Sequence, residues 1–302
     1  MSRTFVLALG LALAGCSSAA ELGTDDAGRE GIDGGRARRD GGIVVEEDGG
    51  ESWTCFVTTC AGRVTLCGNC LDDDGDGLVD AHDPECLGPC DNTEGPALLA
   101  GVGGEPGGPC LSDCYWDFGN GPGNDDCHWD HRCDPFAMAP TYDPEGPSCA
   151  YDASRVGGRD CPARQSAMCR DVCRPLTPSG CDCFGCCTFD AIAERPVAEG
   201  GTHVWIGSVA EGTIVGTCTL DVLDDRTLCR PCTPVYDCYN GCGPCELCIG
   251  RTELPAGCSE GGADGGAPAR CEGGEQPCGL GGEPECPLDT YCISGCCQPT
   301  LI

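Results

Sequence analysis

Cysteine is the residue that most constrains how this chain can fold. The 302 residues include 33 cysteines, and the first of them, Cys16, closes a Leu-Ala-Gly-Cys run at the end of a signal-like segment. The other thirty-two form an even set. A secreted chain in which more than about 8–10% of the residues are cysteine is typically built on disulfides. The composition therefore predicts an exported protein whose cysteines can pair completely.

The N-terminus indicates export. Arg3 supplies a positive charge, residues 4–13 form an apolar stretch too short to cross a bilayer, and small residues precede Cys16. This pattern resembles a bacterial lipoprotein signal with its lipobox, which implies cleavage after residue 15 and lipidation of Cys16. Because Ser17 rather than aspartate follows, the resemblance also implies a lipid anchor in the outer membrane, at the cell surface. The alternative is an ordinary cleaved signal peptide in which Cys16 has no role.

The exported part is poor in the residues that build a hydrophobic core. Leu, Ile, Val and Phe make up about 17% of the chain and the net charge is -32, a combination typical of disorder when cross-links are absent. Up to sixteen disulfides change that expectation, because each typically stabilises a fold by about 2–4 kcal/mol. The strong negative charge argues against nucleic acid as a partner. Divalent cations, a cell-surface protein or a polysaccharide are the partners that remain.

Shifts in composition predict seven parts along the chain. They are a signal peptide (1–15), a disordered acidic Gly-rich tether (16–53), a cysteine-bracketed calcium-loop module (54–91), a Gly/Pro linker (92–109), a cysteine-rich core (110–258), a Gly-rich linker (259–270) and a C-terminal cysteine-knot-like module (271–302).

Signals for regular secondary structure are few. Two β-branched and aromatic runs, 203–209 and 213–223, flank a short turn and predict one β-hairpin or small sheet near 203–223. The best short helix candidate is 191–195, and strands do not alternate with helices. We therefore expect a small disulfide-rich multi-module protein made mostly of loops, and not a barrel or doubly wound enzyme.

A run of aspartates between residues 72 and 83 has the spacing of a twelve-residue calcium loop. Acidic side chains occupy positions 1, 3, 5, 9 and 12, and Gly77 occupies the sixth position, where the chain must turn sharply. Asp83 stands where glutamate is usual and Pro84 follows it, so an exiting helix is disfavoured and the expected affinity is modest. The candidate calcium ligands are the side chains of Asp72, Asp74, Asp76, Asp80 and Asp83 and the backbone carbonyl of Leu78.

Cys70 and Cys86 bracket this loop. In these residues the chain resembles the Asp-rich, cysteine-bracketed loops of thrombospondin type 3-like repeats and related metal-binding motifs of bacterial surface proteins. The resemblance implies that the five aspartates hold the ion. A bridge between the two bracketing cysteines would preshape the site, although connectivity does not follow from the sequence. The alternative to a calcium site is a solvated acidic turn.

The densest cysteine run, 181–187, contains Cys-x-Cys and Cys-Cys spacings that also suit zinc or copper(I) thiolates. An oxidising exterior favours disulfides instead. Together with 245–250, this run resembles a group of cysteine-rich lipoproteins of Gram-negative bacteria, which brings no known activity with it. The final run, 286–297, resembles small secreted cystine knots, some of which inhibit proteases. A soft-metal protein and a protease-inhibitor-like module are therefore the alternatives to a structural or adhesive role.

Signs of catalysis are weak. The one histidine cluster, His128 and His131 beside Asp130, lacks a third metal ligand, and we expect it at the surface. The sequence contains no nucleophile elbow, no phosphate loop and no histidine convincingly partnered with a nucleophile. Aromatic residues near the cluster could stack a sugar, but in a chain with 5% aromatics they are more typical of a small core: Tyr115, Trp116, Phe118 and Trp129. We therefore expect a binding or structural protein and no enzyme.

Overall fold

The computed structural model describes most of the chain beyond residue 37. The described residues are 38–39, 42–46, 52–60, 62–98, 110–117, 126–136, 149–210, 213, 215–251, 253–256, 258, 271, 274–280, 283, 286–287 and 290–299. The predicted signal peptide, Cys16 and the predicted linker at 259–270 lie outside them.

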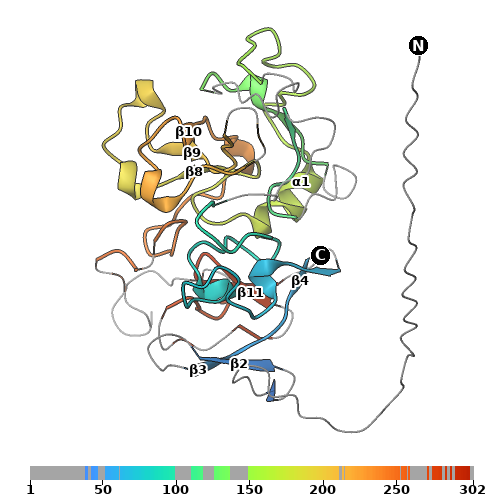
Figure 1. The fold of residues 1–302 in the computed structure, drawn as a ribbon. Coiled ribbons are helices and arrows are strands. Elements are labelled where there is room, and N and C mark those ends of the chain that lie inside the picture. The colour runs from blue at the N-terminus through green and yellow to red at the C-terminus, as the bar shows by residue number, and fades with distance from the viewer. Residues whose placement is uncertain are drawn as a thin grey trace, which may run out of the picture. The chain divides into compact units, whose positions relative to one another are not determined.

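Irregular structure dominates, with short strands and single-turn helices (Figure 1). The strands are β1 (Arg38–Arg39), β2 (Gly42–Glu46), β3 (Ser52–Cys55), β4 (Thr59–Cys60), β5 (Arg63–Val64), β6 (Leu111–Ser112), β7 (Trp129–Asp130), β8 (Cys186–Thr188), β9 (His203–Trp205), β10 (Arg230–Pro231), β11 (Thr290–Ile293) and β12 (Cys296–Pro299). Besides the α-helix α1 (Ala167–Val172), the 3-10 helices are η1 (Leu66–Gly68), η2 (Asp80–His82), η3 (His131–Cys133), η4 (Arg174–Leu176), η5 (Asp190–Ile192), η6 (Val197–Glu199), η7 (Leu220–Val222) and η8 (Tyr236–Cys238). The predicted loop-rich, disulfide-rich fold class is confirmed.

The central sheet has the antiparallel order β10-β9-β8 (Figure 1). Trp205 of β9 pairs with Cys186 of β8 on one side and with Arg230 of β10 on the other. The short sheet predicted near 203–223 is therefore present, but β9 takes its partners from distant segments. The hairpin character is limited to the next few residues, where the amide of Thr217 donates to the carbonyl of Ser208.

The α-helix lies where the sequence did not indicate one. The prediction of a helix at 191–195 was wrong, because only the 3-10 turn η5 forms there. In α1, the side chain of Ser166 caps the first turn by accepting from the amide of Cys169, 2.9 Å away. Cys169 is bridged to Cys127, and Cys173 is bridged to Cys114. Cross-links hold this short helix in place, and hydrophobic periodicity could not reveal them. Within the described part of the chain, no helix combines the length and apolar character needed to span a membrane.

Some residues of the segments predicted as tether and linker form strands or pack in the core. Strands β1 and β2 fall within 16–53, and β2 pairs with β3 through the β-branched run at 43–45. Leu98 falls within 92–109, yet it is fully buried in the main hydrophobic cluster, and its amide donates to the carbonyl of Cys218. A few apolar residues in a polar segment were enough to anchor it.

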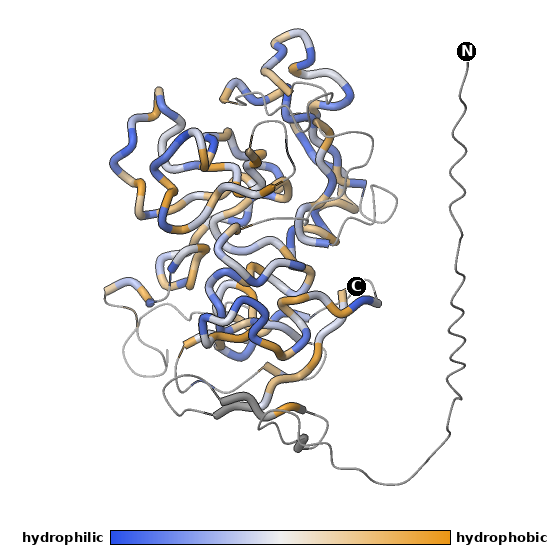
Figure 2. The backbone as a smooth tube through the Cα atoms, viewed as in Figure 1, coloured by the Kyte–Doolittle hydropathy of each residue, from blue (hydrophilic) through white to orange (hydrophobic). Residues whose placement is uncertain are grey.

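Disulfides supply much of what a hydrophobic core supplies elsewhere. All thirty-two cysteines after Cys16 are bridged, in sixteen pairs. Bridged cysteines are the most frequent residue type in the main buried cluster, which also contains Phe184, Phe189 and Ile206. Runs of hydrophobic residues along the chain are short and alternate with hydrophilic ones (Figure 2). A fold cross-linked this heavily is extracytoplasmic, because disulfides persist in oxidising compartments.

The bridges fall into three closed groups. Three join cysteines within 55–90, ten within 110–258 and three within 271–297. Contacts between the groups are noncovalent. The hydroxyl of Tyr291 donates to the carbonyl of Cys67, and the amide of Ser179 donates to the hydroxyl oxygen of Ser294.

Candidate metal site

The aspartate loop at residues 72–83 is wound around its own carboxylates. Oδ1 of Asp72 accepts from the amide of Gly75 at 2.6 Å, and its Oδ2 accepts from Gly77 at 3.2 Å. Asp74 accepts from the amide of residue 76, and Asp76 accepts in turn from the amide of Leu78. Gly75 and Gly77 have φ of 86° and 98°, a left-handed conformation that favours glycine. The sequence therefore folds this stretch into a tight turn that carries acidic side chains at alternate positions.

The charges of the three aspartates that begin the loop act on Asp83. Its pKa is raised to about 6, first by burial and then by the charges of Asp76, Asp74 and Asp72. Its side chain is 2% exposed. Oδ1 accepts from the amide of Glu85 at 2.7 Å, whereas Oδ2 has no hydrogen-bond partner among the described residues. A buried carboxylate oxygen without a donor is costly unless something else pairs with it.

Glu85 adds a fifth carboxylate that the loop spacing did not predict. Its pKa is raised to about 7, first by burial and then by the charges of Asp83, Asp74 and Asp76. Glu85 lies two residues beyond the twelve-residue template, after Pro84. The sequence signal for Glu85 was the short side chain of Asp83 at the position where glutamate is usual, because a longer acidic side chain nearby can reach an ion that aspartate does not.

Asp80, a predicted ligand, faces another environment. It has a φ of 47° and is 2% exposed. Its Oδ2 accepts from the amide of Cys70 at 2.9 Å and lies 3.3 Å from Sγ of Cys55. Burial raises its pKa to about 7, and the acidic neighbours that contribute are Glu94 and Asp73. The charges of Asp72, Asp74 and Asp76 thus act on Asp83, whereas the Asp80 carboxylate is turned toward the Cys55–Cys70 disulfide.

Glu94, which lies beyond the loop in sequence, hydrogen-bonds two backbone amides of the loop. The sequence did not predict this role. The two carboxylate oxygens of Glu94 accept from the amides of Asp73 and Asp80, at 2.6 and 2.8 Å. Burial raises its pKa to about 7, although those two amides favour its charged form. One of its oxygens lies within 4.8 Å of one from Asp83. Glu94 falls in the predicted linker, where no spacing rule pointed to it.

The bracketing cysteines are bridged, but not to each other. Cys70 pairs with Cys55, and Cys86 pairs with Cys67, so the suggested Cys70–Cys86 bridge is wrong. Each end of the loop is nevertheless stapled to a segment that precedes it. The carbonyl of Asp83 accepts from the amide of Cys86, which holds the end of the loop against the second bridge. Leu78, whose backbone carbonyl was a candidate ligand, lies half-buried within the loop.

The cysteine-dense run offers no thiolates. Its four cysteines are bridged as Cys181–Cys187, Cys183–Cys238 and Cys186–Cys232. Sulfurs of several bridges gather within 4.8 Å of one another in the buried core. Since a disulfide sulfur carries no negative charge, these gatherings are cross-linked packing and not soft-metal ligand sets.

The histidine cluster is structural as well. His131 is 8% exposed, so the expectation that it lies at the surface was wrong. Its Nε2 lies 2.6 Å from the hydroxyl of Ser112, its ring packs 4.3 Å from that of Trp205, and burial lowers its pKa to about 4. Asp130 is paired with Arg132 and Arg155, and His128 lies 3.1 Å from Asp160. The three side chains thus bind different partners and do not converge.

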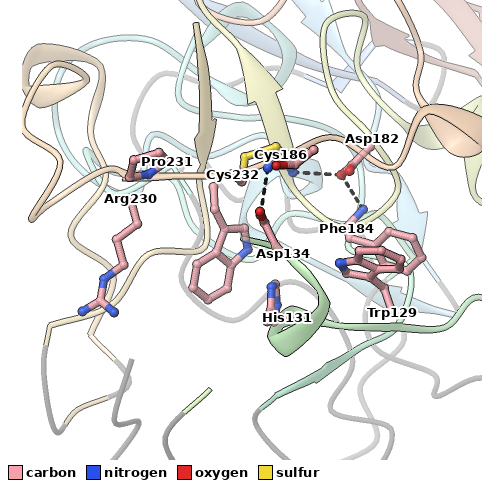
Figure 3. A pocket seen from close by; sticks show the side chains of 11 residues that line it. Trp129, His131, Asp134, Asp182, Phe184, Cys186, Arg230, Pro231 and Cys232 are labelled. Carbon is pink, nitrogen blue, oxygen red and sulfur yellow. Dashed lines mark hydrogen bonds between the residues drawn. A yellow bond between two sulfur atoms is a disulfide. The ribbon is translucent and has the colours of Figure 1, made fainter. Parts of the chain in front are cut away.

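The aromatic residues near the cluster line a small pocket (Figure 3). Trp129 stacks on Phe184, with ring centroids 6.2 Å apart, and Asp182 accepts from the amide of Phe184 beside them. The cavity measures about 20 Å³. That volume accommodates about one water molecule, whereas ligand pockets span roughly 300–1,000 Å³. These aromatics therefore act as core, as do Tyr115 and Trp116, which are buried; Phe118 lies outside the described residues.

Comparisons with known proteins leave the aspartate loop as the main guide to function. No protein-family model matches the chain, and no curated protein or solved structure matches it either.

Proposed function

We propose that this chain is a cell-surface lipoprotein with a structural, adhesive or binding role, in which calcium organises the aspartate-loop module. The observation that carries the proposal is the unpaired buried oxygen of Asp83, at the end of a tight turn that carries acidic side chains at alternate positions and beside Glu85. Like charges near one another repel unless a cation lies between them. The five acidic residues are Asp72, Asp74, Asp76, Asp83 and Glu85.

The donor set suits calcium better than other metals. Calcium takes six to eight hard oxygens at about 2.3–2.6 Å and tolerates irregular geometry. Five carboxylates and the carbonyl of Leu78 offer enough oxygens, and water can complete the set. Magnesium demands near-ideal octahedral geometry, and zinc prefers nitrogen and sulfur. All cysteines of the module are bridged. The ion would neutralise the group and hold the ends of the loop together.

The alternatives have less support. A soft-metal role needs thiolates, and every cysteine after Cys16 is in a disulfide. Bridged cysteines cannot act as nucleophiles either, which favours a non-catalytic role. An inhibitor-like C-terminal module would present an exposed reactive loop. The β11–β12 turn is instead partly buried, and it is held by hydrogen bonds in which the Ser294 hydroxyl accepts from the amide of Ser179 and the Gly295 carbonyl accepts from the amide of Cys278.

The proposed lipid anchor follows from the same pairing. Because the thirty-two later cysteines bridge one another, Cys16 is left for lipidation. A Cys16→Ser variant is expected to lose metabolically incorporated fatty acid and to leave the outer-membrane fraction. Wild-type protein that carries no fatty acid would refute the anchor without touching the calcium proposal.

Isothermal titration of the metal-free, oxidised protein with calcium chloride tests the calcium role. We expect one site with a Kd of about 10⁻⁴–10⁻³ M, as in extracellular calcium modules. Asp72→Asn and Asp76→Asn should abolish the binding heat, and calcium should protect residues 54–91 of the wild type from proteolysis. Asp171→Asn, at an exposed position on α1, is the matched control and should bind normally. No heat from the wild type at millimolar calcium would refute the proposal.

A further inference from the structure

The C-terminal hairpin β11–β12 lies against the aspartate-loop module. Tyr291 of β11 is 5% exposed, and its hydroxyl donates to the carbonyl of Cys67 at 2.8 Å. Residues of η2, which ends the aspartate loop, also contact β11. Burial raises the pKa of Tyr291 well above 10, and the nearby carboxylates of Asp80, Asp91 and Glu94 act in the same direction. The phenol therefore remains a neutral donor among acidic residues.

The residue that Tyr291 holds is covalently linked to the proposed calcium ligands. Cys67 is bridged to Cys86, which follows Glu85 directly. The amide of Cys86 donates to the carbonyl of Asp83 at 3.1 Å. Thus one short path of a hydrogen bond and a disulfide runs from the hairpin to the segment that carries Asp83 and Glu85.

The seam between the two parts leaves some space. A cavity of about 50 Å³ is lined by Thr54, Asp80 and His82 on the loop side and by Tyr291 and Cys292 on the hairpin side. Oδ1 of Asp80 is buried and has no hydrogen-bond partner among the described residues. The buried Asp80 carboxylate therefore lies at the boundary between the aspartate loop and the hairpin.

We propose that calcium binding in the aspartate loop and seating of the β11–β12 hairpin on Cys67 stabilise each other, with Tyr291 as the positioning residue. The inference rests on the proposed calcium site. An ion that draws Asp83 and Glu85 toward the start of the loop fixes their segment and, through the Cys67–Cys86 bridge, the acceptor of the Tyr291 hydroxyl. An acceptor that is already ordered costs less entropy to engage, and the converse holds for the ion.

Tyr291→Phe in the full chain tests the coupling from the hairpin side, because it removes only the hydroxyl. The loss of one hydrogen bond corresponds to roughly a 2- to 10-fold change, so we expect calcium affinity in isothermal titration to fall by a factor in that range. Tyr236→Phe is the matched control, since Tyr236 is 69% exposed, and it should bind calcium as the wild type does.

Amide hydrogen exchange tests the coupling from the loop side. Linkage is reciprocal, so saturating calcium should slow the exchange of residues 290–299 in the wild type. The Asp72→Asn variant should show no such slowing.

The outcomes separate the two proposals. Wild-type protein that fails to bind calcium overturns the calcium role and this inference with it. The coupling alone is overturned if the wild type binds calcium, Tyr291→Phe binds it with the same affinity, and calcium does not change the amide exchange rate of the hairpin. A loss of affinity shared by Tyr236→Phe would also overturn it.

Discussion

Two buried aspartates, Asp182 in the cysteine-rich core and Asp83 in the aspartate-loop module, differ in how their carboxylates are paired. In the core, Asp182 is 1% exposed and accepts from three backbone amides, those of Phe184, Cys186 and Val235. In the loop module, Asp83 is as deeply buried but accepts from one amide, keeps an unpaired oxygen and faces other carboxylates. A buried acid whose oxygens are all used serves the fold. A buried acid that lacks donors and faces like charges is one that a cation would stabilise, as we propose for Asp83.

Reduction of the disulfides should have the largest effect and should act on both regions. Because half-cystines replace much of the apolar core, we expect complete loss of tertiary structure, with or without calcium. Near-ultraviolet circular dichroism of the buried Trp116 and Trp205 would report it. A cooperative unfolding transition that survived full reduction and alkylation would show that the apolar cluster is sufficient without its cross-links.

Asp182→Ala should be the most damaging single substitution in the core. It would leave three buried amides without an acceptor, and we expect a loss of about 4 kcal/mol in the free energy of unfolding. Chemical denaturation of the oxidised protein measures the loss, with the exposed Asp171→Ala as the control. If Asp182→Ala and Asp171→Ala were equally stable, Asp182 would not be a structural carboxylate, and its contrast with Asp83 would not hold.

His131 should make the core sensitive to acid. Burial lowers its pKa to about 4, although the charge of Asp130 acts to raise it, and the pKa in the unfolded chain is about 6.5. Its contribution is full above pH 6.5 and is lost as the pH falls toward 4, because the unfolded chain takes up the proton first. The difference amounts to about 3 kcal/mol between pH 7 and pH 4. Buried carboxyl groups with raised pKa values change the free energy of unfolding with pH in the opposite direction. The contribution of His131 is therefore measured as the difference between the wild type and His131→Gln, in which this pH dependence should disappear. Parallel pH profiles would contradict the assignment.

The sequence predicted the part of this molecule that depends on counting. The even cysteine set predicted complete pairing, which the sixteen bridges confirm, whereas the calcium ligand set that the loop spacing indicates stays a prediction. The sequence could not reveal which cysteines pair, because a bridge such as Cys183–Cys238 depends on how distant segments fold. For the same reason β9 acquired partners that no local hairpin rule indicates.

Glu85 and Glu94 show the same limit within the candidate site. Both lie outside the twelve-residue template, and only folding brings Glu85 beside Asp74 and the Glu94 carboxylate under the amides of Asp73 and Asp80. Asp80 shows the converse, because it matches the template but is turned inward by its left-handed backbone and its bond to Cys70. Spacing fixes where an acid lies along the chain, whereas tertiary contacts decide which way its carboxylate points.

Glu85→Gln should weaken calcium binding without unfolding the loop module. The amide keeps one oxygen and the shape of the side chain but removes the charge, and we expect about a tenfold rise in Kd, or about 1.4 kcal/mol. Titration calorimetry measures it, and Glu246→Gln in the core is the control. An unchanged Kd would remove Glu85 from the ligand set and leave the four aspartates as its acidic members.

Asp80→Asn should have the smallest effect, and it tests whether the comparison also holds inside the loop module. An asparagine oxygen can still accept from the amide of Cys70, so the local fold should persist. If Asp80 is a structural acid like Asp182, the Kd for calcium should change by less than about twofold, because the lost charge is not among those that act most strongly on Asp83 or Glu85. A loss as large as that of Asp72→Asn would instead mean that Asp80 turns outward to the ion, as the loop template predicts, and that the seam with Tyr291 opens when calcium binds.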